Sequence, residues 1–414
     1  MSAALDMHLS SEQRLLYEDT RRLAAETLQP IARAGRPDAV NRPLIAALAG
    51  CGLLGRLFAG GAVRAIELCL IREALARSCT EAETAFAVQG LGSYPILQSG
   101  EAQLRERWVP RVADGTAVAG FALTEPGAGS DVAALALQAV PDGDGHRLTG
   151  EKLWISNAPD ADVYTVFART GQQGARGLTA FAVPGDSEGL SGEPRHLLAA
   201  HAIGSLRFDE VFVAREQMLG AEGEGFAVAM RTLDLFRPSV GAFAVGLART
   251  AIEMAVIHAS ERETFGRPLR DRQAVSHPLA EISAQVEAAR LMVHRAAAAY
   301  DAGAPDPALS AMSKLLATES AQEAVDFAVQ VHGAAALERG HPLEHMYREV
   351  RAPRIYEGAS EIQREIIARA MFREAGTPPA AGTARDARDG RDVRDARDGR
   401  DGRDGRDARD GRDG

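Results

Sequence analysis

The spacing of apolar residues changes twice along this chain of 414 residues, and no other feature of the sequence limits its fold as strongly. From Ser10 to about Val112 apolar residues recur at helical spacing. One helix face is predicted to hold Leu15, Leu16, Leu23, Leu28 and Ile31. Ser10 and Gln13 have the spacing of a capping box, so a helix is predicted to begin between them.

From about Ala119 to Gly220 the pattern becomes typical of strands. The runs Val163–Phe167 and Leu178–Val183 are rich in β-branched and aromatic residues, and turn signals such as Pro141–Gly145 lie between such runs. A small antiparallel unit is therefore predicted here.

Long alanine-rich amphipathic stretches return after residue 223, at about Val240–Glu263, Ala280–Tyr300 and Ala311–Val331, and these lengths suit a helical bundle. We predict an α+β chain that is mostly α. It has an N-terminal helical domain at residues 1–118, a middle antiparallel β domain at 119–222, a C-terminal four-helix bundle at 223–375, and a disordered linker and tail at 376–414.

The tail, Arg385–Gly414, consists of ten Arg-Asp-X triplets in which X is Gly, Ala or Val. It has almost no apolar surface to bury, so we expect it to stay solvated. A collagen helix is excluded because X is not always glycine and the repeat contains no proline.

Composition excludes several classes of function. The net charge is −10 and aromatic residues make up 5%, which argues against binding to nucleic acid or to an anionic membrane surface. The cysteines, Cys51, Cys69 and Cys79, form no CxxC pair, as expected in a reducing compartment. The longest uncharged stretch, Thr84–Gly100, is interrupted by glycines and a proline, and the first residues form no export signal. A cytoplasmic protein without a membrane span is predicted.

The sequence contains no HExxH, GxSxG or Walker motif, so a zinc hydrolase, a serine hydrolase and a P-loop enzyme are not indicated. His258, His277, His294 and His332 occur singly in helical stretches, where a structural role is more common than metal binding. The glycine-rich turn at Phe121–Asp131 follows a strand-like run, and its N–H and hydroxyl groups suit a planar heterocycle or a phosphate. An ordinary surface turn is the alternative reading of this composition.

Four segments together resemble the acyl-CoA dehydrogenase family, in the family's order and over about residues 10–372. They are TEPGAGSD at Thr124–Asp131, KLWISNA at Lys152–Ala158, RETFG at Arg262–Gly266 with QAV at Gln273–Val275, and IYEGASEIQR at Ile355–Arg364. The resemblance implies FAD as cofactor, bound between the β unit and the C-terminal helices of two subunits in a homo-oligomer, a dimer or a tetramer. It also implies electron-transfer flavoprotein as the electron acceptor.

By this resemblance, Phe121, Leu123 and Thr124 would contact the flavin pyrimidine edge, Trp154 would flank the ring and Ser156 would reach N5. Arg262 and Thr264 of a neighbouring subunit would meet the pyrophosphate, while Gln273, Gln330 and Gly333 would hold the adenosine half. The remaining cofactor residues implied by the motifs are Ser130, Phe265, Ala359 and Glu361. Arginine does suit a diphosphate on physical grounds, and a hydroxyl suits a ring nitrogen.

Glu357 is the catalytic residue that the resemblance implies. The implied reaction is the α,β-desaturation of an acyl thioester, in which a base removes the weakly acidic α proton. A carboxylate enclosed between a flavin and an alkyl chain is desolvated, which raises its pKa toward the working range. Some relatives carry the base on a helix instead, but the comparable position here is Phe236, which cannot take a proton. Ser130, Asp234, Arg237 and Gly358 are then predicted to contact the substrate.

Two segments depart from the family pattern. The usual Gly-Gly-x-Gly becomes Gly333–Ala336, which places a methyl group where the backbone approaches the adenosine half. The loop expected to form the entrance is shortened to Phe58–Gly61, which puts the acyl pocket in doubt.

An acyl-CoA thioester is the first choice of substrate, and fatty acid metabolism the expected setting. Three alternatives remain open: an acyl group bound to a carrier protein in secondary metabolism, a flavin-dependent monooxygenase of the same fold, and a non-catalytic interaction protein. Retention of Glu357 argues against the monooxygenase.

Overall fold

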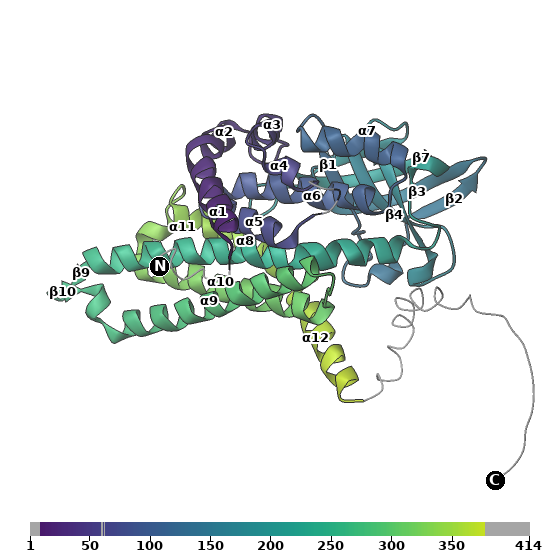
Figure 1. The fold of residues 1–414 in the computed structure, drawn as a ribbon. Coiled ribbons are helices and arrows are strands. Elements are labelled where there is room, and N and C mark those ends of the chain that lie inside the picture. Colours follow the sequence, from purple (N-terminus) through teal and green to yellow (C-terminus); the bar gives the residue numbers. More distant parts are fainter. Residues whose placement is uncertain (1–8, 59–60, 62, 377–414) are drawn as a thin grey trace, which may run out of the picture.

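The computed structural model describes residues 9–58, 61 and 63–376. The predicted tail and nearly all of the predicted linker lie outside the described residues, as do Ala59 and Gly60 of the shortened loop. The described chain runs from helices through a sheet to helices again (Figure 1), so the predicted order of helical, β and helical segments is confirmed.

The first part of the chain is helical. Its helices are α1 (Ser11–Leu23), the π-helical η2 (Ala24–Leu28), α2 (Gln29–Ala34), α3 (Arg42–Gly50), α4 (Leu53–Arg56), α5 (Ala65–Ala76), α6 (Thr80–Ser99) and α7 (Ala102–Ala113). The capping box is present: the Gln13 N–H donates to Ser10 Oγ, and the Ser10 N–H donates to the Gln13 side chain.

The predicted apolar face of the first helix is partly wrong. Leu16 and Leu28 are buried, but Leu15 is 62% exposed. The buried stripe follows steps of four residues through Leu16, Thr20, Ala24 and Leu28, and Leu15 lies about 100° away from it around the helix.

The middle part is an eight-stranded sheet whose path is β6-β7-β3-β2-β4-β5-β8, with β1 beside β4. The strands are β1 (Ala119–Ala122), β2 (Gln138–Asp142), β3 (Gly145–Ser156), β4 (Val163–Arg169), β5 (Leu178–Pro184), β6 (Leu190–Pro194), β7 (Ile203–Ala214) and β8 (Met218–Leu219). The two predicted runs form β4 and β5, and the predicted turn at Pro141–Gly145 joins β2 to β3.

The prediction of an antiparallel sheet is wrong in one respect, because the sheet is mixed. β1 runs parallel to β4, with Ala119 opposite Val163, and β2 pairs with β4 in parallel through Gln138 and Arg169. Parallel neighbours need long connections, and at least twenty residues separate β4 from either partner along the chain.

The last part is a helical bundle, and its helices are longer than predicted. Its elements are α8 (Gly225–Glu261), a hairpin of β9 (Glu263–Thr264) and β10 (Arg267–Pro268), α9 (Gln273–Asp301), α10 (Pro307–His332), α11 (Pro342–Glu349) and α12 (Ser360–Glu374). The predicted start of the first helix at Val240 is wrong because α8 continues through Pro238. Proline removes the helical donor to the Asp234 carbonyl, and the Ser310 hydroxyl donates to that carbonyl instead, at 3.2 Å.

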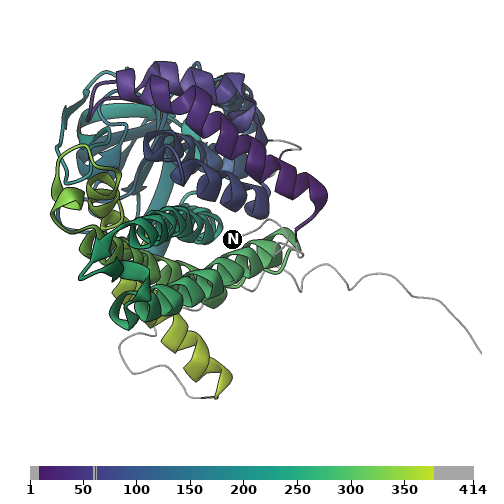
Figure 2. The ribbon, with the colours of Figure 1, turned by 90° about the vertical axis from the view of Figure 1, so that its left-hand side faces the viewer.

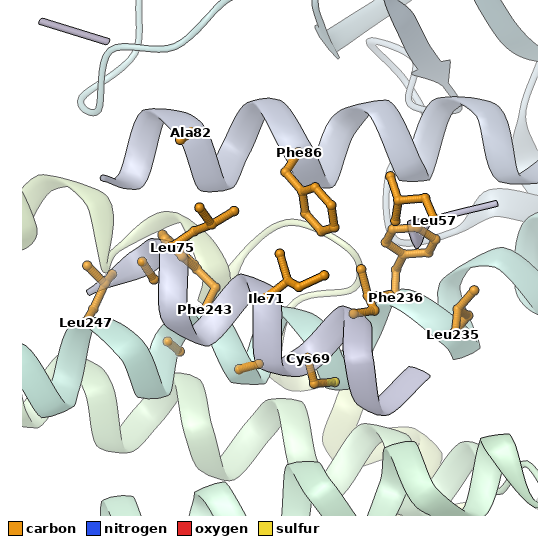
Figure 3. Close-up of a cluster of buried hydrophobic side chains, with 14 of the residues drawn as sticks. Leu57, Cys69, Ile71, Leu75, Ala82, Phe86, Leu235, Phe236, Phe243 and Leu247 are labelled. Carbon is orange, nitrogen blue, oxygen red and sulfur yellow. The ribbon is translucent and has the colours of Figure 1, made fainter. Parts of the chain in front are cut away.

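The core lies where α5, α6 and α8 meet, and Figure 3 shows the side chains that these helices contribute. Small residues allow the helices to approach closely. A Cβ on Gly246 of α8 would lie 2.5 Å from the Glu73 carbonyl of α5. Figure 2 looks nearly along α8, which passes between the N-terminal helices on one side and α9 and α10 on the other.

Within the described residues, α8 alone is long and apolar enough to cross a membrane. Most of its apolar window, 61%, is buried inside this protein, as in the central helix of a bundle.

Candidate functional site

Glu357 lies in a short loop before α12, and the backbone of this loop is tightly held. Glu357 has φ +52° and Gly358 has φ +93°, so two successive residues occupy the left-handed region. Lys314 Nζ donates to the Tyr356 carbonyl at 2.6 Å and to the Gly358 carbonyl at 2.5 Å. Gln363 Nε2 donates to the Gly358 carbonyl at 2.8 Å. These bonds fix the loop in a conformation that a free chain would avoid.

The Glu357 carboxyl is desolvated. Its Oε2 is buried and makes no hydrogen bond with any residue that the structure describes. Burial raises the pKa of Glu357, and the charges of Arg72, Lys314 and Arg237 oppose that rise in decreasing order. Such a carboxyl can take up a proton at a higher pH than a solvated one.

Tyr356 precedes Glu357 on the same loop and is 36% exposed. The pKa of its phenol is raised well above the ordinary value, mainly by desolvation, and the nearby charges of Glu83 and Glu357 add to that rise.

Lys314 was missed by the sequence reasoning as a site residue. It is 1% exposed, and desolvation lowers its pKa to about 7. The chain has only two lysines, and the other, Lys152, is also buried, with Nζ 2.8 Å from Glu125 Oε1 and 2.9 Å from the Leu123 carbonyl. Arginine is the basic residue at every other position that carries a permanent positive charge. The rarity of lysine was therefore the one sequence signal that could have marked Lys314 as a residue with a special role.

Asp234 and Arg237 lie on α8 beside the same loop. Arg237 Nη1 donates to Asp234 Oδ1 at 2.9 Å, and Arg237 Nε lies 3.4 Å from the Glu357 carbonyl. Phe236 between them is fully buried and contacts the ring of Tyr94, with 6.1 Å between centroids. The structure therefore brings Asp234, Arg237 and Gly358 together with Glu357.

A second group of predicted residues gathers at the end of β1 and along β3. The Leu153 N–H donates to the Thr124 carbonyl at 2.9 Å, which joins the two motif segments. Phe121 contacts Phe167 edge to face, with 5.0 Å between centroids. Trp154 has φ +59° and is 50% exposed, so this chain leaves much of its ring uncovered. Ser130 is exposed on the loop that follows.

Ser156 has a partner that the sequence reasoning did not identify. Its hydroxyl lies 3.0 Å from His201 Nε2. Burial lowers the pKa of His201 to about 4, so this imidazole is neutral near pH 7. No motif contains His201, and only the folded chain places it beside β3.

A third group lies far from Glu357 within one chain. Arg262 ends α8, Thr264 lies in β9, Phe265 is 97% exposed at the hairpin tip, and Gln273 begins α9. Figure 1 shows this hairpin at the opposite end of α8 from the sheet. Arg237 on α8 and Arg262, the C-cap of that helix, are 25 residues apart, which corresponds to about 38 Å along the helix axis. One chain therefore does not bring this group to Glu357.

Gln330 and Gly333 lie at the end of α10, near the last turn of α8. His332 between them stacks on His258 of α8, with 4.2 Å between ring centroids. Gly333 has φ +66°, and a methyl group added at its Cα would meet no atom within 4 Å, so the surface there is open. Ala359 caps α12, and Glu361 in its first turn is exposed and lies 3.5 Å from Arg364.

Across the described ranges, no three His, Cys, Asp or Glu side chains gather in a way that could hold a metal ion.

Three family models match the chain in order. They are the N-terminal domain of acyl-CoA dehydrogenase over residues 10–116, its middle domain over 120–211 and its C-terminal domain over 223–372. A cyclohexane-1-carbonyl-CoA dehydrogenase of Geobacter metallireducens is 36% identical over 375 residues, which are 88% of this chain and 99% of that protein.

Solved structures agree with these matches. A chain from work on the electron transferring flavoprotein of Acidaminococcus fermentans has a TM-score of 0.84 and 31% identity, covering 89% of this chain and all of that one. The FAD complex of PigA has a TM-score of 0.83 and 28% identity, covering 89% of this chain and 99% of its own. With all three domains matched in order, the chain belongs to the acyl-CoA dehydrogenase family of flavoprotein oxidoreductases.

Proposed function

We propose that this protein catalyses the FAD-dependent α,β-dehydrogenation of an acyl-CoA to an enoyl-CoA, with Glu357 as the base that takes the α proton. The observation that carries the proposal is the Glu357 carboxyl, which is buried with an unpartnered Oε2 on a loop held by Lys314 and Gln363. A buried acceptor without a donor is costly unless a ligand or a proton meets it.

The residues of the β domain fit a flavin. Trp154 leaves half of a large ring uncovered, and the Ser156 hydroxyl lies next to a neutral imidazole rather than a charge. Phe121, Leu123 and Thr124 would hold the pyrimidine edge there. When bound, FAD supplies an acceptor for the hydride that leaves the β carbon.

The base must stay charged until the substrate arrives. Arg72, Lys314 and Arg237 favour the carboxylate form of Glu357, while its burial favours the neutral form, so this group can both hold its charge and accept a proton. Lys314 acts on the backbone on both sides of Glu357 and thereby directs the carboxylate. Phe236 has no acidic group and leaves this task to Glu357.

The thioester arm is proposed to pass Arg237 and Asp234, which face the loop of Glu357 from α8. Ser130 and Gly358 complete the proposed substrate contacts. The relative that acts on cyclohexane-1-carbonyl-CoA, by its name, supports CoA as the thiol. A carrier-bound acyl group remains the alternative, and competition by free CoA would distinguish them, because only a CoA enzyme binds the free nucleotide.

The groups that lie far apart in one chain suggest a site shared between two copies. Arg262, Thr264, Phe265 and Gln273 cannot reach the Glu357 of their own chain, so we propose that they serve the cofactor of a neighbour in a homo-oligomer. Gln330, Gly333, Ala359 and Glu361 are proposed cofactor contacts as well. The tetramer, electron-transfer flavoprotein as acceptor, fatty acid metabolism and the cytoplasmic location stay predictions.

Anaerobic mixing of the FAD-loaded protein with cyclohexane-1-carbonyl-CoA and butyryl-CoA tests the proposal. The yellow absorbance should bleach with at least one such thioester, and Glu357→Gln should retain FAD but bleach at least about 100-fold more slowly. Glu365→Gln, an exposed glutamate on α12, is the matched control and should bleach normally. Normal bleaching in Glu357→Gln would contradict the assignment of the base.

A further inference from the structure

His201 is a half-buried histidine whose imidazole is hydrogen-bonded to Ser156. Its Nε2 lies 3.0 Å from the Ser156 hydroxyl, and this is the one hydrogen bond that the described residues give to the ring. His201 belongs to no motif and lies two residues before Ile203, which pairs with Ser156 in the ladder between β3 and β7. This hydrogen bond therefore joins a side chain outside the motifs to a residue proposed to hold the cofactor.

The backbone at the end of β3 holds Ser156 and His201 together. Around Trp154, β3 contains one residue more than β7 does, and such bulges re-aim side chains. Trp154 has φ +59° and Asn157 has φ +64°, so left-handed residues lie on both sides of Ser156. The Asn157 N–H donates to the Ala202 carbonyl at 2.8 Å. This bond fixes the residue after Ser156 to the residue after His201.

The imidazole of His201 is a neutral partner for the hydroxyl. Burial lowers the pKa of His201 to about 4, and the charge of Asp38 opposes that fall. The Asp38 carboxylate is itself bonded to another histidine, with 3.0 Å between its Oδ2 and His196 Nδ1. A neutral imidazole carries a proton on one ring nitrogen and a lone pair on the other. With its proton on Nδ1, His201 accepts the hydrogen of the Ser156 hydroxyl at Nε2.

The direction of the Ser156 hydroxyl matters because this group has one hydrogen to donate and two lone pairs that accept. Ser156 is proposed to meet flavin N5, which is an acceptor in oxidised FAD and an N–H donor in reduced FAD. A hydroxyl whose hydrogen points to N5 favours the oxidised form, and one whose oxygen faces N5 favours the reduced form. The partner of the hydroxyl hydrogen therefore decides which form Ser156 prefers.

We propose that His201 is a positioning residue for the cofactor: it holds the hydrogen of the Ser156 hydroxyl, so that the Ser156 oxygen accepts the N5–H of reduced FAD. His201 acts through Ser156 and is assigned no contact with the cofactor. This inference rests on the proposed function, because it takes Ser156 as the residue that meets N5. It goes further by assigning a preference for reduced FAD to a side chain outside the four motif segments.

The midpoint potential of the bound flavin measures this preference, and its measurement needs no thioester. His201→Phe keeps a ring but removes both nitrogens, so the Ser156 hydrogen becomes free to turn toward oxidised N5. Reduced FAD should then bind about tenfold more weakly relative to oxidised FAD, which lowers the potential by about 30 mV for a two-electron couple. His201→Gln retains an acceptor for the hydroxyl and should recover most of that loss. Anaerobic titration of the FAD-loaded proteins with dithionite beside a reference dye gives the potentials.

Ser156→Ala separates positioning from packing. This variant lacks the oxygen that accepts N5–H, so its potential should also fall. Adding His201→Phe to Ser156→Ala should cause no further fall, because the imidazole then has no hydroxyl to direct. A packing role of His201 would give the same fall in both backgrounds.

His196→Gln is the matched control. His196 lies five residues before His201, its side chain is 75% exposed, and it bonds Asp38 rather than Ser156. The potential of this variant should equal that of the wild type.

An unchanged potential in His201→Phe, or an equal fall with and without Ser156, would overturn the role of His201. If His201→Phe does not fold, His201→Leu, which also lacks a ring nitrogen, carries the same test. If no thioester bleaches the flavin, the proposed function fails, while the potentials still decide the role of His201.

Discussion

The backbone around Glu357 depends on single side chains that the motif does not contain. Lys314 supplies two hydrogen bonds to the carbonyls on either side of Glu357. In Lys314→Met the Tyr356 carbonyl loses its charged donor, whereas the Gly358 carbonyl keeps its bond from Gln363. An unpaired buried carbonyl costs about 1–3 kcal/mol.

We therefore expect Lys314→Met to lower the free energy of unfolding by about 1–3 kcal/mol and to slow flavin bleaching by acyl-CoA. Urea denaturation and stopped-flow absorbance measure the two effects. If Lys314→Met is less stable but its flavin bleaches at the wild-type rate, Lys314 supports the fold and not the geometry of Glu357.

His201 gives a pH dependence whose sign follows from its burial. Its pKa falls from 6.5 to about 4 in the folded chain, so the stability it contributes is present above pH 6.5 and is lost as pH falls through the folded value. We expect the wild type to lose roughly 2–3 kcal/mol relative to His201→Gln over this range. Urea denaturation at a series of pH values measures it, and parallel curves for the two proteins would contradict it.

Among single residues, those inside the motifs could be predicted as site residues from the sequence, but the side chains that contact them could not. Glu357, Arg237 and Thr124 lie in local strings that could be recognised, and the structure places Arg237 beside Glu357. Lys314 and His201 are separated from their partners Tyr356 and Ser156 by 42 and 45 residues along the chain, so no local pattern could reveal them. The distant groups are proposed to serve a second chain, and a single sequence does not describe that contact.

Among the elements, α6 and β1 approach more closely than ordinary side chains allow. A Cβ on Gly92 would lie 2.7 Å from the Gly120 nitrogen and 2.9 Å from Ala119. This contact sets the position of β1, which leads into the predicted flavin-binding turn.

We expect Gly92→Ala to destabilise the protein by about 1–3 kcal/mol, because backbone rather than a flexible side chain must move. Gly50→Ala at the end of α3 is the matched control, since a methyl group there meets nothing within 4 Å, and it should change stability by less than about 1 kcal/mol. Thermal unfolding compares them, and equal melting temperatures would show that β1 can shift without cost.

Element types were easier to predict than their limits or partners. The runs that form β4 and β5 were recognisable, but their parallel neighbours were not, because pairing depends on how long connections return to the sheet. The first bundle helix was predicted to start at about Val240, yet α8 continues through Pro238, where Ser310 from another helix satisfies the carbonyl that the proline leaves free. Both errors come from contacts between residues distant in the sequence.

For the whole molecule, the length of α8 leads to a test of assembly. If Arg262 of one copy serves Glu357 of another, a mixed dimer of Arg262→Ala and Glu357→Gln contains one site with both substitutions and one with neither. Refolding equal amounts of the two inactive variants together should restore about a quarter of the wild-type activity. Each variant refolded alone is the control, and no recovery in a mixture shown to contain mixed oligomers would place the whole site within one chain.

The burial of both lysines has a practical consequence for the whole molecule. Lys152 and Lys314 are 0% and 1% exposed, so acylating dyes that attack primary amines should find only the α-amino group on the native protein. Once the chain opens, two further adducts should appear in the intact mass spectrum. Labelling of Lys152 would then report opening of the sheet, and labelling of Lys314 would report opening of the bundle. The scarcity of lysine thus gives each part of the molecule a single chemical probe of partial unfolding.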